Sequence, residues 1–175
     1  MKQLFPFLFI AILLTSCGAS HKAASTSYII VPDANTKVLK GVISRSLIEN
    51  DTSFAWFKEN MKWGQADPAA IDAFKKNAGK FKMVVFGGTW CHDTQNLLPV
   101  FYRLVDKSGY DEKNITLIAV DRSKQTLNDL HTTYHITNVP TFIVFQDGKE
   151  IGRIVEYGKY SMIDKELGEI VNSIK

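Results

Sequence analysis

The spacing of apolar residues predicts a series of strands in the second half of the chain. Met83–Phe86 is a short apolar run closed by two glycines, which is typical of a buried strand. Ile115–Val120 is a longer continuous apolar run, so we expect a strand that is buried on both faces. Thr141–Phe145 and Glu150–Glu156 flank an Asp-Gly pair, and this arrangement predicts two strands joined by a tight hairpin turn.

Spacings of three and four between apolar residues predict helices among these strands. One helix is expected over His92–Lys107, with a kink at Pro99 because proline removes a backbone hydrogen bond. A second helix is expected over Lys124–Tyr134. Ser161 and Asp164 are spaced like a capping box, which predicts that a last helix begins there. From residue 80 onward the order is therefore β-α-β-α-β-β-α.

The segment before residue 80 carries fewer signals. Val38–Ile48 alternates loosely between apolar and polar residues and indicates a strand. Asp51 is placed to cap a short helix over Phe54–Lys62. Asp67 followed by Pro68 predicts the start of another helix, because aspartate is a good N-cap and proline is favoured at the first helical position.

The first residues of the chain have the features of an export signal. Lys2 provides a positive charge, and Leu4–Leu14 is an apolar stretch that is too short to span a bilayer. The sequence ending at Cys17 resembles the bacterial lipobox, in which this cysteine is lipidated and becomes the first residue of the mature protein. We therefore expect residues 1–16 to be a lipoprotein signal peptide. The alternative is an ordinary secretory signal with an incidental cysteine.

A lipid on Cys17 would anchor the protein to a membrane of the bacterial cell envelope, facing the periplasm or the exterior. Residues 17–36 are rich in alanine, serine and threonine, and are expected to form a lipidated tether. The net charge of the chain is +3 and it contains no basic run, so nucleic acid is not an expected partner.

A single cysteine separates the first central strand from the helix that follows it. Cys91 thus lies at a helix N-terminus, where free N–H groups and the helix dipole favour a thiolate. The chain has two cysteines, so lipidation of Cys17 would leave Cys91 as the only free thiol, with no disulfide partner in the chain. The Thr94 hydroxyl can point at the sulfur, protonated His92 would favour the thiolate, and Asp93 would oppose it.

Two motifs, in this order, resemble those of the thioredoxin family. Trp90–Thr94 (Trp-Cys-x-x-Thr) between a strand and a helix, with a proline eight residues after the cysteine, resembles the active-site segment of that family. Val139–Phe142 followed by Asp147-Gly148 resembles its cis-proline loop and terminal hairpin. The resemblance covers about residues 68–175 and implies an α/β, thioredoxin-like fold with a central mixed β-sheet flanked by helices. Residues 37–67 would be an N-terminal extension.

The resemblance also implies where a substrate would bind. The peptide bond before Pro140 is expected to be cis, and the backbone of Val139 is expected to pair with an extended peptide. Cys91 would be the nucleophile, and Thr94 would stabilise its thiolate. The expected substrate-binding residues are Trp90, His92, Asp93, Val139, Pro140 and Thr141. For Trp90, a role in packing alone is the alternative.

Three positions depart from the pattern of the family. Thr94 stands where a second cysteine is usual, Val85 where thioredoxins have a buried acid, and Leu117 where a lysine is common. In the family the acid and the lysine serve proton transfer at the second cysteine, so their joint absence fits a site with a single thiol. We therefore expect monothiol chemistry without a cofactor, in which Cys91 forms mixed disulfides with protein or small-molecule thiols and disulfides.

Other interpretations of these residues stay open. One alternative is a binding module with a redox-inactive Cys91, and another is a single-cysteine peroxidase or oxidant sensor that forms a sulfenic acid. His131 and His135 lie four residues apart, but no second pair of ligands has metal spacing, so no metal site is expected. Gly87-Gly88 replaces bulkier residues that the family often has there, which predicts an open pocket near Trp90.

Overall fold

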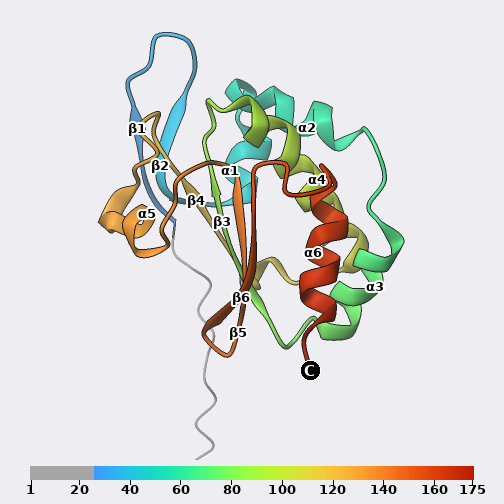
Figure 1. The fold of residues 1–175 in the computed structure, drawn as a ribbon. Helices are drawn as coiled ribbons and strands as arrows, with labels where there is room; N and C mark the ends of the chain where they lie inside the picture. Colours follow the sequence, from blue (N-terminus) through green and yellow to red (C-terminus); the bar gives the residue numbers. More distant parts are fainter. Residues whose placement is uncertain (1–25) are drawn as a thin grey trace, which may run out of the picture.

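The computed structural model describes residues 26–175, whose six strands form one mixed sheet in the order β1-β2-β4-β3-β5-β6 (Figure 1). The central neighbours β3 and β4 run parallel, and the other neighbouring pairs run antiparallel. The strands are β1 (Ser27–Val31), β2 (Val38–Ile43), β3 (Lys82–Gly87), β4 (Ile115–Ala119), β5 (Thr141–Gln146) and β6 (Lys149–Val155). The predicted signal peptide, residues 1–16, and the predicted lipidation site Cys17 lie outside the described residues.

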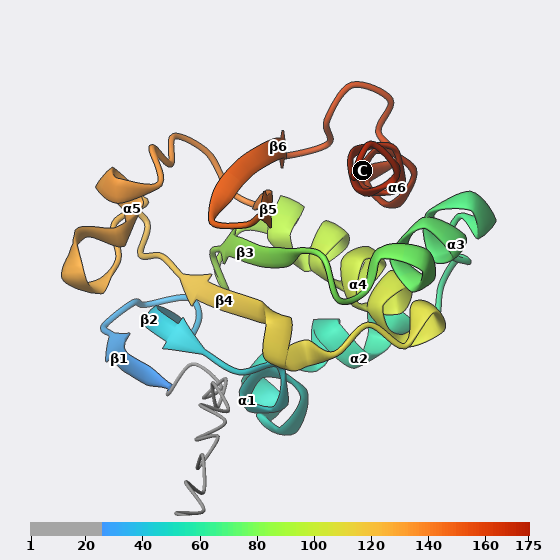
Figure 2. The same cartoon turned by 90° about the horizontal axis from the view of Figure 1, so that it is seen from below.

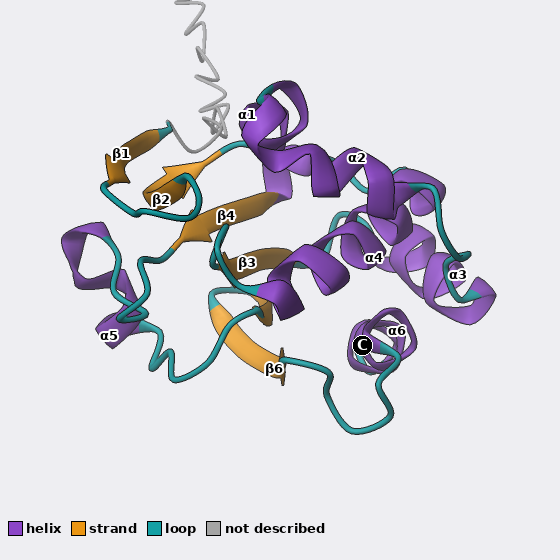
Figure 3. Cartoon of the chain, turned by 90° about the horizontal axis from the view of Figure 1, so that it is seen from above, coloured by secondary structure: helices purple, strands orange, loops and turns teal. Residues whose placement is uncertain are grey.

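Helices cover the two faces of the sheet unequally. The α-helices are α1 (Arg45–Asn50), α2 (Ala55–Met61), α3 (Pro68–Asn77), α4 (His92–Ser108), α5 (Leu130–Thr133) and α6 (Ile163–Asn172). Figure 2 shows α1, α2, α3, α4 and α6 on one side of the sheet and α5 on the other, and Figure 3 shows the same division from the opposite end. None of the helices in residues 26–175 has both the length and the apolar character needed to cross a membrane.

Alternation along the strands divides the core into two clusters. In β3, Met83 and Val85 face the five helices, whereas Val84 and Phe86 face the side of α5. The helix side is rich in aromatic residues that meet edge to face, and the other side is a smaller cluster that includes Tyr134. Both faces of β3 are therefore buried, as the apolar run predicts, and the strand that leads to the cysteine is firmly fixed.

The structure confirms most of the predicted elements at the centre of the chain. β3 and α4 cover their predicted ranges, β4 ends at Ala119, one residue before the predicted end, and Pro99 lies inside α4. β5 and β6 meet at a tight turn in which Asp147 and Gly148 have φ values of 50° and 77°, as a type I′ hairpin requires. Asp67 caps α3 by accepting a hydrogen bond of 2.8 Å from a first-turn N–H group, and Pro68 is the first helical residue.

The helix predicted over Lys124–Tyr134 is wrong. A 3₁₀ turn followed by the single turn of α5 replaces it, and Asn128 has a φ of 55°, which no α-helix allows. At the start of the predicted range, the carboxylate of Asp121 accepts hydrogen bonds from the backbone N–H groups of Ser123 (2.9 Å) and Gln125 (3.0 Å), and Lys124 has a φ of 60°. Such local side-chain bonds compete with helical hydrogen bonds and favour a turn.

The capping box predicted at Ser161 and Asp164 is also wrong. α6 begins at Ile163, no side chain caps it, and Ser161 has a φ of 56° in the turn before it. The Asp164 carboxylate instead accepts a hydrogen bond of 2.8 Å from the backbone N–H of Asp67. The carboxylate that the local pattern assigns to a helix cap therefore bonds to the residue before α3 instead.

Part of the predicted tether belongs to the sheet. Within residues 17–36, Ser27–Val31 forms β1, because its tyrosine and β-branched residues suit a strand, and it pairs with Val38–Val42 of β2. β2 in turn pairs with β4, so the segment predicted as an N-terminal extension, residues 37–67, begins inside the same sheet. The hairpin of β1 and β2 is thus built into the fold.

Candidate functional site

Cys91 lies where β3 ends and α4 begins, as predicted, and its side chain contacts the proline loop. Cys91 is the N-cap residue of α4, and its thiol is half-buried. Its Sγ donates a hydrogen bond to the carbonyl oxygen of Val139, with a distance of 3.4 Å between the two atoms. The peptide bond between Val139 and Pro140 is cis, which confirms the prediction. A thiol, a helix N-terminus and the proline loop therefore meet at one point.

The start of α4 is suited to a negative charge on the sulfur. The N–H groups in the first turn of a helix lack partners within the helix and carry a partial positive charge, which stabilises an anion at the N-cap. Cys91 occupies this position, and Asp93 in the first turn is half-buried. The Cys91 side chain makes no capping hydrogen bond to this turn, and a thiol in this position can act as a nucleophile once it loses its proton.

Thr94 does not make the predicted contact with the sulfur. Its Oγ1 accepts a hydrogen bond of 3.1 Å from the backbone N–H of Gly88. Its Cγ2 lies so close to Gly87 that a Cβ there would be only 2.9 Å away. Among the hydrogen bonds of residues 26–175, none joins Thr94 to Cys91. The buried Thr94 therefore supports the loop that carries the cysteine.

The open pocket predicted beside the two glycines is filled by the indole of Trp90. A Cβ on Gly88 would lie 2.8 Å from the indole ring. The indole Nε1 donates a hydrogen bond of 3.0 Å to the carbonyl oxygen of Val120, and the guanidinium of Arg122 lies 5.4 Å from the centroid of the ring. Trp90 is half-buried, so it packs against the loop and still presents part of its surface beside Cys91.

Of the other predicted substrate-binding residues, His92 lies at the surface and Thr141 is buried. His92 is exposed, and its Nδ1 lies 3.2 Å from the side-chain nitrogen of Asn96. The same nitrogen donates to the hydroxyl of Tyr157 at 3.3 Å. Thr141 is buried, and its hydroxyl donates to the carbonyl oxygen of Asn138 at 2.7 Å. His92 is therefore accessible at the site, whereas Thr141 holds the proline loop from within.

The strands that lead to the site are apolar at two positions of interest. β3 and β4 place Val85 directly beside Leu117, and the two residues are 0% and 3% exposed. Thioredoxins have a buried acid at the position of Val85 and commonly a lysine at the position of Leu117. Neither side chain can donate or accept a proton, so these positions offer no proton relay to Cys91.

The two histidines at the end of the misassigned helix do not share a helix face. His131 belongs to α5, but His135 lies beyond it with a φ of 53°. Within residues 26–175, no group of three His, Cys, Asp or Glu side chains gathers closely enough to hold a metal ion.

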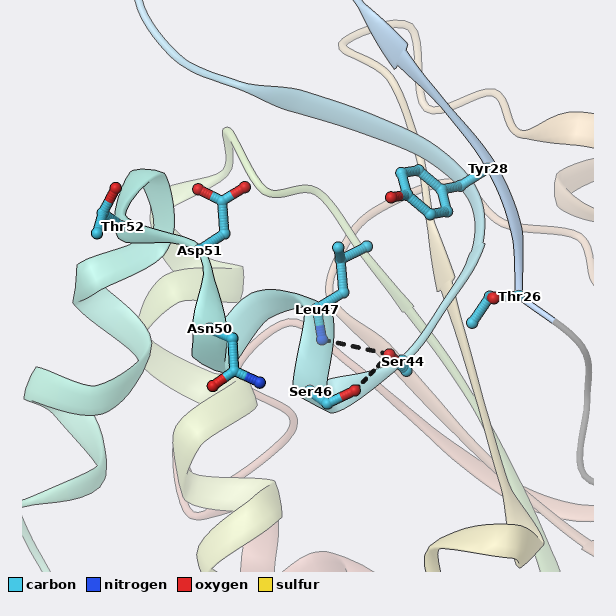
Figure 4. Close-up of a pocket in the computed structure, with 8 residues that line it drawn as sticks. All are labelled: Thr26, Tyr28, Ser44, Ser46, Leu47, Asn50, Asp51 and Thr52. Carbon is cyan, nitrogen blue, oxygen red and sulfur yellow. Dashed lines mark hydrogen bonds between the residues drawn. The ribbon is translucent and has the colours of Figure 1, made fainter.

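A separate pocket of about 580 Å³ lies beside β1 and α1 (Figure 4). Its lining residues are Thr26, Tyr28, Ser44, Ser46, Leu47, Asn50, Asp51 and Thr52. Ser44 is engaged as the cap of α1, since its hydroxyl accepts a hydrogen bond of 3.2 Å from the N–H of Leu47. None of these residues belongs to the Cys91 site, so the nucleophile and this pocket are separate features.

Two residues near the site are not found by sequence reasoning. Arg122 donates hydrogen bonds from Nε and Nη2 to the carboxylate of Asp33, at 2.5 and 3.2 Å. This bonded guanidinium holds the pKa of Asp33 well below its usual range. The two residues are 89 positions apart, and no local pattern in the sequence relates them.

Comparison with known proteins decides the family. The family model described as Thioredoxin matches residues 68–169, which is more than half of the chain. The chain belongs to the thioredoxin family. A thioredoxin of Coprinus comatus is 33% identical over 87 residues, which cover 49% of this chain and 78% of that protein. The TPR repeat-containing thioredoxin TDX of Arabidopsis thaliana is 29% identical over 90 residues, which cover 51% of this chain but only 22% of that protein.

A solved structure supports the fold over a longer range. The crystal structure of an HIV epitope scaffold matches with a TM-score of 0.55 at 15% identity, and the match covers 77% of this chain and 94% of that one. The family match and the mixed sheet flanked by helices together confirm the predicted α/β, thioredoxin-like fold. Membership of the thioredoxin family implies redox chemistry with thiol and disulfide groups. The family match begins at Pro68, so β1, β2, α1 and α2 lie outside it.

Proposed function

We propose that this protein is an exported, lipid-anchored thioredoxin-family protein that performs thiol-disulfide exchange through Cys91 alone. The observation that carries the proposal is the position of the thiol, at the N-cap of α4 and 3.4 Å from the carbonyl oxygen of Val139 beside Pro140. A threonine three residues later takes the place of a second cysteine. The chain therefore has a nucleophile in a suitable place and no thiol beside it in the motif to resolve the product.

The exchange would proceed in two balanced steps. The Cys91 thiolate attacks one sulfur of a substrate disulfide, a new S–S bond forms, the old one breaks, and the leaving thiolate takes a proton from water. A second thiolate, from a small molecule or another protein, then attacks the substrate sulfur of the mixed disulfide; a new S–S bond forms between these two sulfurs, the bond to Cys91 breaks, and the released Cys91 thiolate takes a proton from water. Because Val85 and Leu117 are apolar, the protons of both steps would be exchanged with solvent. The Val139 backbone would align an extended substrate.

The proposed location rests on the sequence of the first residues. A charged residue, an apolar stretch and a lipobox-like end at Cys17 support export and lipidation, with the domain held at a membrane of the cell envelope. Labelling of cells with a fatty acid analogue tests this part. Incorporation should depend on Cys17, and Cys17→Ser should abolish it. Equal incorporation into this variant would contradict the anchor.

The proposed exchange is tested on residues 18–175, which contain one cysteine and the whole of the described sheet. Incubation with a disulfide-containing peptide should give one mixed disulfide per chain, visible by intact mass and reversed by dithiothreitol. Cys91→Ser should give none. If the folded wild-type protein forms no adduct, and its thiol reacts only in denaturant, the exchange function is wrong.

A redox-inactive binding module is the second candidate. It is favoured by one observation, the apolar pair of Val85 and Leu117 where the resemblance leads one to look for ionisable groups. A binding module would keep its partner after Cys91→Ala, whereas an exchange protein would lose covalent capture. Pull-down of envelope proteins with and without reductant separates the two candidates.

A further inference from the structure

The hairpin of β1 and β2, residues 27–43, lies outside the family match, yet it is bonded to the segment that carries Cys91. In Figure 1 the loop of this hairpin and the start of α4 lie at the same end of the sheet. The hydroxyl of Thr89 donates to the carbonyl oxygen of Lys37 at 2.9 Å and accepts from the N–H of Leu39 at 3.2 Å. The start of β2 is thus joined directly to the active-site loop.

A second connection runs through side chains to the residue immediately before Cys91. Asp33 in the hairpin loop binds the guanidinium of Arg122 through two hydrogen bonds, and this guanidinium lies 5.4 Å from the ring centroid of Trp90. The Asp33 carboxylate is itself fixed, because it accepts a hydrogen bond of 3.0 Å from the N–H of Asn35, and its side chain is 12% exposed. The chain of contacts ends on the active-site tryptophan.

The two hydrogen bonds to Asp33 restrict the positions that the Arg122 side chain can adopt. This side chain is 48% exposed. An arginine side chain without partners populates many rotamers in water, because holding it in one rotamer costs conformational entropy. The Trp90 indole next to this guanidinium packs against Gly88 and donates a hydrogen bond to the carbonyl oxygen of Val120. The position of the indole therefore depends on the position of the loop. The indole packs on Gly88, whose carbonyl oxygen accepts a hydrogen bond of 2.9 Å from the N–H of Cys91, so the placement of the indole and that of the Cys91 backbone are linked through Gly88.

We propose that Asp33 is a positioning residue of the Cys91 site. By holding Arg122 over Trp90, Asp33 fixes the position of the indole on the hairpin side of the site. The position of the indole in turn determines how an extended disulfide substrate approaches the sulfur. The part that concerns substrates rests on the proposed function. The part that concerns the indole does not, because it follows from contacts between side chains of the folded protein.

The first experiment observes the indole N–H of Trp90 by NMR and uses no exchange chemistry. Asp33→Asn keeps the size of the side chain and removes its charge. We expect the Trp90 indole signal to shift and its hydrogen exchange to become at least about threefold faster, because its bond to Val120 opens more often. The buried indole N–H of Trp56 is an internal reference that should not change. An unchanged Trp90 signal and exchange rate would overturn the proposal.

The second experiment measures the rates at which Cys91 reacts with a disulfide-containing peptide and with iodoacetamide. Asp33→Asn should slow the peptide reaction by about threefold to tenfold, since a small misplacement of a reacting group is costly, and should leave alkylation within about twofold. Because Asp33 acts through Arg122, the double variant should react no more slowly than Arg122→Gln alone. Additive losses would overturn the proposal. A wild-type protein that is alkylated but does not exchange would refute the proposed function, and the indole measurement would then decide the role of Asp33.

A matched control is available in β6. Glu150 and Arg153 form an ion pair of the same kind, with two hydrogen bonds of 2.6 and 2.5 Å, and this pair does not contact Trp90. Glu150→Gln should change neither the indole exchange nor the reaction rates. If Glu150→Gln altered both measurements as much as Asp33→Asn does, the effect would be a general loss of stability and the positioning role would be rejected.

Discussion

The two sides of the Cys91 site are built by different means. On one side the proline loop, Val139–Thr141, is buried and held by backbone and hydroxyl hydrogen bonds. On the other side the hairpin loop reaches Trp90 through an ion pair of two partly exposed side chains. The proline side lies within the family match and the hairpin lies before it. A site can therefore extend beyond the segment by which its family is recognised.

The difference has a physical consequence for how each side responds to conditions. Ion pairs near the surface are screened by salt, whereas hydrogen bonds in a buried loop are screened much less. The hairpin side should therefore loosen in high salt or in acid while the proline side is retained. The following changes separate the two sides, beginning with the one that should cost most stability.

The largest effect is expected from Gly88→Ala on the hairpin side. The new Cβ would lie 2.8 Å from the Trp90 indole, so the ring or the loop must move. We expect the free energy of unfolding, measured by urea denaturation, to fall by about 1–3 kcal/mol, as for overpacking in a core. Gly79→Ala is the control, since no atom lies within 4 Å of its Cβ position and a change below about 1 kcal/mol is expected. Equal losses in the two variants would contradict this account.

A smaller effect is expected from Thr141→Val on the proline side. The change keeps the shape of the side chain but removes the hydroxyl that donates to Asn138, and it leaves that carbonyl oxygen without this bond. The free energy of unfolding should fall by about 1–2 kcal/mol, the cost of losing a buried hydrogen bond. Thr133→Val removes a hydroxyl that donates to a carbonyl oxygen at the surface, and should cost less than about 0.5 kcal/mol. Thermal denaturation of both variants compares the two costs.

The smallest effect on stability is expected from acid titration of the hairpin. Arg122 lowers the pKa of Asp33, so the contribution of their pair is complete above the ordinary aspartate pKa of about 3.9 and is lost as the pH falls toward the lowered value. In Arg122→Gln, NMR titration should show the Asp33 pKa rising, though still below 3.9 because the N–H of Asn35 continues to donate. Asp51, whose pKa Lys37 lowers to about 2, should titrate as before. No rise at Asp33 would show that the pair is absent in solution.

Local sequence patterns predict the centre of this fold well and its margins poorly. Met83–Phe86 could be assigned because an unbroken apolar run bounded by glycines has few alternatives, and Cys91 could be placed because the helix after it shows a clear apolar spacing. The cis bond before Pro140 was predicted by resemblance to a family. These features depend on neighbours in sequence or on a shared motif.

The errors have a common cause: in each case a polar side chain makes a hydrogen bond other than the one that the local sequence pattern predicts. Asp121 turns the chain where apolar spacing favours a helix, and Asp164 binds the start of α3 where the local motif favours a cap. Asp33 and Arg122 meet across 89 residues, and only the paired strands bring them together. The sequence predicts that Thr94 lies at the site, but it does not predict the direction of the hydroxyl. This hydroxyl accepts a hydrogen bond from the backbone N–H of Gly88 and not from the nearby thiol.

The direction of β1 determines at which end of the sheet the preceding chain enters the domain. The strand runs toward the end of the sheet that holds Cys91, and its five residues advance about 16 Å at about 3.3 Å per residue. Residue 26 therefore joins the domain at the end remote from the nucleophile. If Cys17 carries the proposed lipid, the chain that leads from the lipid enters the domain at that end, and the thiol lies at the opposite end of the sheet from this point of attachment.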